Sequence, residues 1–384
     1  MRRVVLAVGA LAVLAAPGAA FAKKKSKQGA GSAAPAPADA AKDAEDSGDD
    51  AGKLTVSGRV LARETLESRP SAAWTGEASL ESARVAAKYR WKKRLRAEVS
   101  IEAASGKAKL RDAYLTLGLG DGFWVRGGRF KLPVSSIELT SKWTLPTVDR
   151  GFLSDVLSDG LQVTGRRIGF AVGWQGKGDL DPRVELGAFQ ALDLAGDPAA
   201  GELGDGAGLV YAGRASLALP PGLVVAIFGE SRLQQLATTG AHERFWAAGA
   251  DLELDLSRCG CGLRAWADVV AGSTPLDTTP ATTATPTFVA VRGVLAWRHG
   301  GDEIGGRYLE PYAAAATIDP NLDNAHDAVW SGALGVNVGR WRRYRLGVEF
   351  EVRRSYSNRP PVLGGADNDL ADRDALTLQL GAAF

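Results

Sequence analysis

The stretch that decides the fold opens with Lys109-Leu-Arg-Asp-Ala-Tyr-Leu-Thr-Leu-Gly-Leu119, and a glycine turn joins it to Phe123-Trp-Val-Arg-Gly-Gly-Arg-Phe130. In the first segment apolar residues alternate with polar ones, as in a half-buried strand. The next segment begins Lys131-Leu-Pro-Val-Ser-Ser-Ile-Glu-Leu-Thr-Ser-Lys-Trp143, and strand character returns only near Ile168. A hairpin that leads into a long polar and aromatic loop is what a pore-forming barrel needs, with the loop folding inward to narrow the channel.

Alternation with a period of two continues from Leu54 to the end of the chain. The predicted strands are 54–63, 78–90, 94–103, 109–119, 123–130, 168–175, 182–190, 209–219, 222–230, 245–255, 262–271, 287–298, 306–316, 329–339, 343–353 and 375–384. A soluble β-sandwich also alternates, but its strands are shorter, about 5–6 residues, whereas tilted strands of about 9–11 residues cross a bilayer. We therefore predict an all-β fold, a transmembrane antiparallel β-barrel of about 16 strands with an inward-folded constriction loop.

The links between these strands are alternately short and long through most of the series. Tight turns are expected at 92–93, 120–122, 220–221 and 339–341, and long segments begin near Lys131, Ala191, Ser231, Gly272, Thr317 and Arg354. Outer-membrane barrels have short periplasmic turns and longer outer loops. With an even number of strands, this rhythm predicts that both ends of the barrel domain, residues 54–384, lie in the periplasm.

Two segments precede the predicted barrel domain. Residues 1–22 carry a positive head, an apolar run and a small-x-small cleavage site, Ala20-Phe-Ala22, which predicts an export signal peptide. A membrane-anchoring helix is the alternative, but the apolar run is too short for about 30 Å of hydrocarbon. Residues 23–53 lack aromatic and branched side chains, so we predict a disordered low-complexity periplasmic linker. This linker is either a solvated spacer or a tether attracted to the cell wall.

The chain ends with Leu376-Thr-Leu-Gln-Leu-Gly-Ala-Ala-Phe384, an amphipathic strand that finishes on an aromatic residue. This ending resembles the signal that the barrel-assembly machinery recognises. That machinery and the lipid of the outer membrane are therefore the expected partners of the barrel. The alternative is that a last strand simply happens to end on an aromatic residue.

Four motifs follow one another in the central stretch: Arg111-Asp-Ala-Tyr114, Val125-Arg-Gly-Gly-Arg-Phe-Lys-Leu-Pro133, Ser136-Ile-Glu-Leu-Thr-Ser141 and Val148-Asp-Arg150. Together and in this order they resemble the signature of the phosphate-selective porin O and P family of outer-membrane porins. The departures from the family's usual residues are Arg129 in place of Gln, Val134 in place of an aromatic residue and Asp149 in place of Glu. The resemblance implies a homotrimer and phosphate-type solutes. It assigns no anion-binding positions, because those lie outside the motifs.

The first strands carry mostly basic residues on the register that alternation points into the lumen. These residues are Arg59, Arg63, Arg84, Lys88, Arg90, Arg94 and Arg96, against Glu98 and Glu102. Charges in a wet lumen are ordinary, but a one-sided run of arginines raises the local anion concentration. We therefore expect small anionic solutes. In the loop, the candidates to line the constriction are Lys131, Ser135, Ser136 and Lys142, because ammonium and hydroxyl groups bind small oxyanions.

Few residues suggest a metal site, a cofactor site or an enzyme active site. The histidines, His242, His299 and His326, fall in separate connections, so we expect no metal site, no cofactor and no enzyme activity. The segment Asp319-Pro-Asn-Leu-Asp-Asn324 has the oxygen spacing that opens a calcium loop. It lacks the glycine and the closing Glu of such a loop, which favours an ordinary polar connection. Cys259 and Cys261 are expected in a periplasmic turn, as a disulfide or as a free pair. We expect no nucleic-acid partner.

The sequence therefore predicts an outer-membrane porin, a passive diffusion channel for small hydrophilic solutes that prefers phosphate-like anions. An alternative from a different class is a non-channel outer-membrane barrel that acts as a scaffold tethered to the cell wall. Electrical conductance separates the two, because a closed barrel would show none.

Overall fold

The computed structural model describes residues 52–69, 73–92, 94–104, 107–191, 208–235, 242–273, 286–301, 304–324, 327–356 and 372–384. The strands are β1 (Lys53–Ser68), β2 (Thr75–Trp91), β3 (Leu95–Ala104), β4 (Lys107–Gly120), β5 (Phe123–Lys131), β6 (Arg166–Gln175), β7 (Arg183–Gln190), β8 (Leu209–Leu219), β9 (Leu223–Gln235), β10 (His242–Asp255), β11 (Leu263–Ser273), β12 (Thr287–Trp297), β13 (His299–Gly300), β14 (Arg307–Asp319), β15 (Val329–Arg340), β16 (Tyr344–Ser355) and β17 (Arg373–Ala383). The predicted export signal lies outside the described residues, and so does the predicted linker except for its last two residues.

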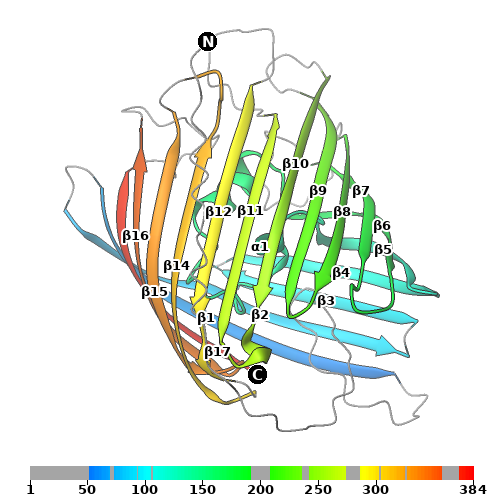
Figure 1. The fold of residues 1–384 in the computed structure, drawn as a ribbon, viewed down its shortest axis with the longest axis horizontal. Helices are drawn as coiled ribbons and strands as arrows, with labels where there is room; N and C mark the ends of the chain where they lie inside the picture. The colour runs from blue at the N-terminus through cyan, green and yellow to red at the C-terminus, as the bar shows by residue number, and fades with distance from the viewer. Residues whose placement is uncertain are drawn as a thin grey trace, which may run out of the picture. The chain divides into compact units, whose positions relative to one another are not determined.

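The strands form one closed antiparallel sheet. Except at the two-residue β13, each strand pairs with the next along the chain, and β1 also pairs with β17, which closes the ring (Figure 1). The two-residue β13 pairs with β14 just as β12 does, and only Arg298 separates β12 from β13. The seventeen strands therefore make a wall of sixteen, which confirms the predicted β-barrel. No helix in the described part of the chain is long and apolar enough to cross a membrane.

The alternation along each strand separates a lipid-facing surface from a lumen. In β3, Val99 and Ile101 are exposed on the outside, whereas Glu98, Ser100 and Glu102 are buried on the inside. Large apolar side chains are exposed in the same way around the wall: Phe170, Leu186, Ile227, Trp297, Leu334 and Leu380. An apolar outer band with a polar interior is the arrangement that a bilayer imposes on a barrel.

The strand connections separate the barrel into two ends. Short turns at 121–122, 220–222 and 341–343 lie at one end, here called the short-turn end. The strand ends that border 132–165, 191–208 and 356–372 lie at the other, the long-loop end. The predicted strands are all present, and most extend beyond their predicted bounds. One difference concerns Arg94, which was expected on a strand but lies in the turn before β3.

Gly128 shapes the place where β5 leads into the longest described connection. Its φ is +126°, and a Cβ there would lie 2.2 Å from the carbonyl oxygen of Ala113 in β4. Only glycine tolerates both the backbone angle and this close approach. The Gly127-Gly128 pair of the sequence motif therefore lets β5 lie tightly against β4 before the chain leaves the wall.

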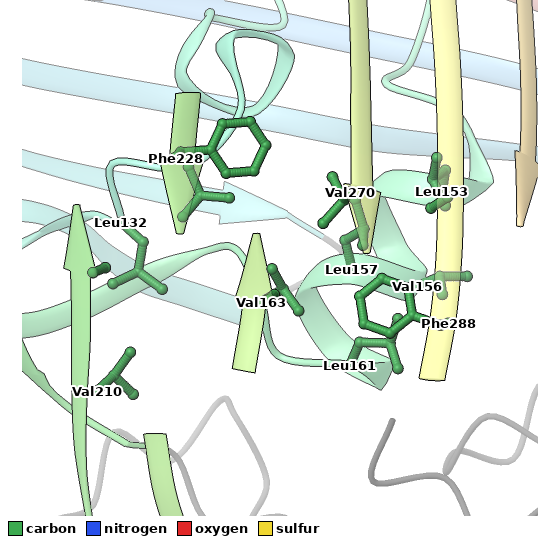
Figure 2. Packing of buried hydrophobic residues seen from close by; sticks show 14 of the residues in the cluster. Leu132, Leu153, Val156, Leu157, Leu161, Val163, Val210, Phe228, Val270 and Phe288 are labelled. Carbon is green, nitrogen blue, oxygen red and sulfur yellow. The ribbon is translucent and has the colours of Figure 1, made fainter. Parts of the chain in front are cut away.

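Residues 132–165, here called the inward loop, fold into the barrel as predicted. The loop contains α1 (Ser136–Leu139), α2 (Phe152–Asp155) and the π-helical turn η1 (Val156–Gly160). Figure 2 shows apolar side chains of the loop packed against others that project inward from the wall. From the loop come Leu132, Leu153, Val156, Leu157, Leu161 and Val163, and from the strands come Val210, Phe228, Val270 and Phe288. This apolar cluster fills part of the lumen near the long-loop end and holds the loop inside.

Candidate pore constriction

The inward loop is fastened to the far wall by a buried ionic cluster around Arg292 of β12. The guanidinium lies 2.7 Å from Glu138 Oε1 in α1 and 2.8 Å from Asp268 Oδ2 in β11. It also donates to Ser135 Oγ at 3.0 Å, and that hydroxyl donates to Asp268. Burial alone would raise the pKa of Glu138, but the charge of Arg292 outweighs this effect and the pKa lies below its usual range. The cluster is satisfied internally, so it positions the loop.

The middle of the loop is held through its backbone carbonyls. Leu145 O accepts from Arg345 Nη1 at 2.8 Å, and Val148 O accepts from Gln379 Nε2 at 2.9 Å. Pro146 O accepts from Asn337 Nδ2 at 2.5 Å. The donors belong to β15, β16 and β17, whose inward polar side chains are thereby occupied by the loop. On β9 to β16, arginines that project inward are buried: Arg232, Arg264, Arg292, Arg298, Arg345 and Arg353.

A ring of four charges joins the loop to β1 and β2. Arg63 lies 2.8 Å from Glu81 and 3.1 Å from Asp149, and Lys142 lies 2.8 Å from each of the same two carboxylates. Burial would raise the pKa of Asp149, but Lys142 and then Arg63 outweigh it and hold this pKa well below its usual range. For Lys142, burial is outweighed by Asp149 and Glu81, so the ammonium pKa is raised. Opposite charges on both sides therefore favour the charged forms of Asp149 and Lys142.

The inner surface of β1 to β6 has a different character, because its basic side chains face water while their acidic partners lie beneath them. The side chain of Arg111 is 39% exposed and that of its partner Glu102 only 8%. The same order holds for Lys88 and Glu98, at 29% and 11%. We call this surface the basic face: Arg63, Arg84, Lys88, Arg111 and Arg166. A solute in the open lumen therefore meets cations first.

Asp112 organises the centre of the basic face. Its carboxylate accepts from Arg166 Nε at 2.8 Å and from Arg166 Nη2 at 3.2 Å, and it also accepts from Arg84. Arg84 in turn donates to Ser100 Oγ at 2.9 Å. One carboxylate thus orients two guanidinium groups, and Arg84 also lies 3.6 Å from Glu98. Both guanidinium groups are thereby held in fixed orientations.

The wall residues predicted from the sequence are found either on the basic face or in contact with the inward loop, and a few lie near the strand ends. Arg63, Arg84 and Lys88 belong to the basic face, and Arg59 donates to Ser141 Oγ of the loop at 2.6 Å. Arg96 lies on β3 opposite Thr116, in the lumen register, whereas Arg94 is an exposed turn residue. Arg90 lies near the end of β2, paired in register with Arg96.

Most of the four loop candidates form hydrogen bonds or ion pairs within the protein. Lys131 Nζ donates to the carbonyls of Glu138, Leu139 and Thr140, at 2.6, 2.9 and 3.4 Å, and so closes the end of α1. Ser135 and Ser136 are buried where the loop packs against β10 and β11, and they do not border open space. Lys142 is half-buried within the ring of four charges. These side chains place the loop, and the open lumen is bordered instead by the basic face.

Sequence reasoning missed Arg111, Arg150 and Arg166 as lumen residues. Strict alternation would point Arg111 outward, but Arg111 is the extra residue of a bulge in β4, opposite Ser100 and Ile101 of β3, and its side chain bonds the inward-facing Glu102. Arg150 donates to the carbonyl of Ile137 at 3.2 Å and to that of Thr140, and burial lowers its pKa. The motif Arg111-Asp-Ala-Tyr114 was the available signal, since its first two residues form the centre of the basic face.

The histidines and cysteines do not form a metal or catalytic site within the described residues. His299 lies in β13 and His242 begins β10, while His326 lies outside the described residues. Within the described ranges, no group of three or more His, Cys, Asp or Glu side chains could hold a metal ion. Cys259 and Cys261 are exposed free thiols in the turn after β10. The disulfide that the sequence allowed is therefore not formed, and the free pair remains.

The family model for phosphate-selective porin O and P matches residues 75–220, which include β2 to β8, the inward loop and most of the basic face. Residues 75–220 belong to that family. The barrel is therefore an outer-membrane barrel of the porin type, as the resemblance of its motifs implied. This family and fold are those of channel proteins and not of enzymes.

Solved structures with a similar fold share little sequence identity with this chain. The outer membrane channel DcaP of Acinetobacter baumannii has a TM-score of 0.61 at 11% identity, covering 87% of this chain and 97% of its own. An anion-selective porin from Comamonas acidovorans has a TM-score of 0.59 at 12% identity, covering 87% and 100%. In-vitro folded OmpT of Vibrio cholerae, in a trimer form, has a TM-score of 0.55 at 11% identity, covering 87% and 100%. A search of curated protein sequences finds no match.

Proposed function

We propose that this outer-membrane channel is a passive, anion-preferring pore for small hydrophilic solutes, with the inward loop as its constriction and phosphate-like ions as its preferred class. The observation that carries the proposal is the basic face. Its cations are more exposed than the carboxylates that pair with them, whereas the inward-projecting arginines of the opposite wall named above are buried. No catalytic step is part of this function.

The mechanism follows from where the charges lie. The inward loop is bonded to β12, β16 and β17 and, through the ring of four charges, to β1 and β2, so solutes pass along the remaining inner surface near Arg84, Arg111 and Arg166. Low-dielectric walls focus the field of Arg84, Arg111 and Arg166 into the remaining space and raise the local concentration of anions. Each guanidinium replaces part of the hydration shell of an ion as it passes. The carboxylates beneath keep the binding weak enough for release.

Phosphate-type oxyanions suit this surface better than simple halides. A guanidinium presents a planar fork that binds two oxygens of one oxyanion, and Asp112 fixes the orientation of two such forks. The family match and the anion-selective relative support the same preference. Assembly as a homotrimer is proposed on the same grounds, with the trimer form of a structural neighbour as support.

The test is the reversal potential of the purified barrel in planar bilayers separated by a KCl gradient. An anion-preferring pore gives a potential with the sign of chloride permeation, and added phosphate reduces the chloride current in proportion to its occupancy. A potential near zero or of the opposite sign contradicts anion preference. Complete absence of conductance by a folded barrel would favour the scaffold tethered to the cell wall.

The flanking segments fit delivery of such a barrel to the outer membrane. We propose that residues 1–22 are removed as an export signal and that residues 23–53 form a periplasmic spacer. We further propose that the C-terminal strand recruits the barrel-assembly machinery. In the structure Phe384 extends the pairing of the C-terminal strand with β1. Its N–H donates to Gly58 O at 3.0 Å, and its carbonyl accepts from Gly58 N at 3.1 Å.

A further inference from the structure

Two charged side chains lie on the outward register of the wall, among apolar neighbours. In β1, Glu64 is paired in register with Leu378 of β17, whose side chain is 45% exposed on the outer surface. In β5, Arg129 is paired in register with Ile168 of β6, whose side chain is 47% exposed on the same surface. A charge that faces lipid is unfavourable unless an opposite charge neutralises it. Both positions therefore call for a partner.

The protomer does not supply these partners within the residues that the structure describes. Neither Glu64 nor Arg129 forms an ion pair there, and Arg129 Nε is buried without a hydrogen-bond partner. The charged groups beside them are bound elsewhere. Arg63 faces the lumen and pairs with carboxylates there, and Arg166 is held by Asp112. Neutralisation of the two outward charges is thus left to groups outside the protomer.

Glu64 borders a hollow of about 450 Å³ in the outer surface of β1, β2 and β17. The space is left by two small side chains, Ala62 and Ala78, and it is bordered by larger apolar ones, which include Leu80 and Leu378. Apolar walls around a single carboxylate fit a long side chain that has an aliphatic stem and a cationic head. An arginine side chain has this form.

We propose that the outer face of β1 to β5 is a contact between two copies of this chain, in which Arg129 of one protomer enters the hollow of the next and pairs with Glu64 there. These strands lie side by side as one sector of the wall (Figure 1). A lipid ammonium group would neutralise only Glu64, and a lipid phosphate only Arg129, whereas a second copy supplies both partners. The inference rests on the homotrimer of the proposed function and identifies the surface through which the trimer forms.

The placement of the two charges suits a ring of three. Each protomer presents Glu64 at one edge of the sector and Arg129 at the other, so the contact is heterologous and closes into a ring. The edges are four strands apart in a wall of sixteen, about 90° around it, and the two neighbours in a ring of three lie about 60° apart. Following paired residues once around the wall returns to β1 about 20 residues away, which corresponds to a strand tilt of about 40°. At that tilt Arg129 lies about 7 Å nearer the short-turn end than Glu64, a difference that two long side chains span.

Cross-linking between protomers tests the contact. Chains with Glu64→Cys are refolded together with chains that carry Arg129→Cys, both with Cys259→Ser and Cys261→Ser, and are treated with a bismaleimide whose spacer is about 10 Å, longer than a disulfide reaches. The mixture should give covalent dimers, and either variant alone should give none. The control mixture joins Ile227→Cys with Leu334→Cys, exposed positions of β9 and β15, and should also give none. Absence of dimers from the test mixture, or equal yield from the control, overturns the proposal.

Charge exchange gives a second readout, the mass of the detergent-solubilised complex in analytical ultracentrifugation. Glu64→Arg or Arg129→Glu alone brings like charges together and should lower the association constant of the trimer at least about tenfold, and the double exchange should restore it. Arg244→Glu, an exposed change on β10, should leave the trimer intact. Glu64→Gln and Arg129→Gln, which should weaken the trimer less, replace the reversals if those chains do not fold.

The outcomes separate this contact from the proposed function. A wild-type trimer that neither single reversal weakens, or that the double exchange does not restore, overturns the contact and leaves the homotrimer standing. A monomeric wild type overturns both, while the reversal potential still tests anion preference independently. Labelling of Glu64→Cys by a lipid-soluble maleimide in the assembled barrel would place lipid in the hollow and likewise overturns the proposal.

Discussion

Arg292 of β12 and Glu138 of α1 are joined by an ion pair of 2.7 Å, although 154 positions of sequence separate them. Both side chains are buried, and Asp268 completes the cluster from β11. The pair fixes the first helix of the inward loop to the wall opposite the basic face. The width of the open lumen depends on this attachment, because the loop cannot shift while the cluster is intact.

Arg292→Met is expected to loosen the constriction. It leaves Glu138 and Asp268 buried without a cation, and removing one partner of a buried pair costs about 3–5 kcal/mol. Open-channel current should become larger and noisier, and the temperature at which the folded barrel converts to the unfolded band on a gel should fall. The control is Arg354→Met, whose partner Asp374 lies in an exposed pair worth about 0–1 kcal/mol. Unchanged current and conversion temperature in Arg292→Met would show that the apolar cluster alone holds the loop.

Selectivity should reside in the basic face. The double variant Lys88→Gln with Arg111→Gln should lower the anion-to-cation permeability ratio by roughly twofold or more, because these cations border the narrowed lumen. Arg340→Gln with Arg343→Gln removes the same formal charge from exposed positions at the short-turn end. Reversal potentials in a salt gradient compare the two. Equal shifts would mean that net charge, and not position, sets the preference.

The loop should stay in place through mildly acidic pH. The folded-state pKa of Asp149 is held below its unfolded value of about 3.9, so its contribution to stability is present above that pH. The contribution is lost only as the pH falls through the lower, folded-state pKa. Conductance of the wild type should therefore be constant from neutral pH to about pH 5. Asp149→Asn should show altered conductance already at neutral pH, and a wild-type transition between neutral pH and pH 5 would contradict this assignment.

Deletion of Phe384 should slow insertion of the barrel and leave degraded or periplasmic protein. Phe384 pairs with Gly58 across the seam, so its loss removes two backbone hydrogen bonds in addition to any assembly signal. Phe384→Ala keeps the backbone pairing and removes the aromatic ring, which separates the two effects. The amount of each variant in the outer-membrane fraction is the measurement that separates an assembly signal from lost backbone pairing. Normal yield of the deletion variant would count against an assembly signal at this end.

Removal of residues 23–51, with the signal peptide retained, should leave heat-resistant migration and conductance nearly unchanged. The segment lacks the side chains that build a core, and the described wall begins only at Lys53. Gel migration and single-channel conductance of the shortened chain provide the measurement. A chain that no longer migrates as a folded barrel would show that this segment has a structural role.

Much of the barrel was predictable because its rules are local. Side chains alternate across a strand, and lipid requires the outward set to be apolar. The outward orientation of residues such as Val99 and Ile101 can therefore be predicted from the sequence. The alternation of turns and long connections then indicates how many strands form the wall. The hairpin at 109–130 and the segment after it predicted the inward loop, because no strand pattern could continue there.

The roles of the charged lumen residues were decided by tertiary structure. Lys131 and Ser135 were predicted as constriction residues. Lys131 instead bonds carbonyls of α1, and Ser135 accepts from Arg292, a contact between distant parts of the chain. Arg111 faces inward only because it is the extra residue of a bulge in β4. A charge contributes to the pore only if it is exposed there, and its exposure depends on which side chains the loop covers. Sequence thus determined the wall and its lipid face, while the folding of the loop across the lumen decided which cations remain in contact with water.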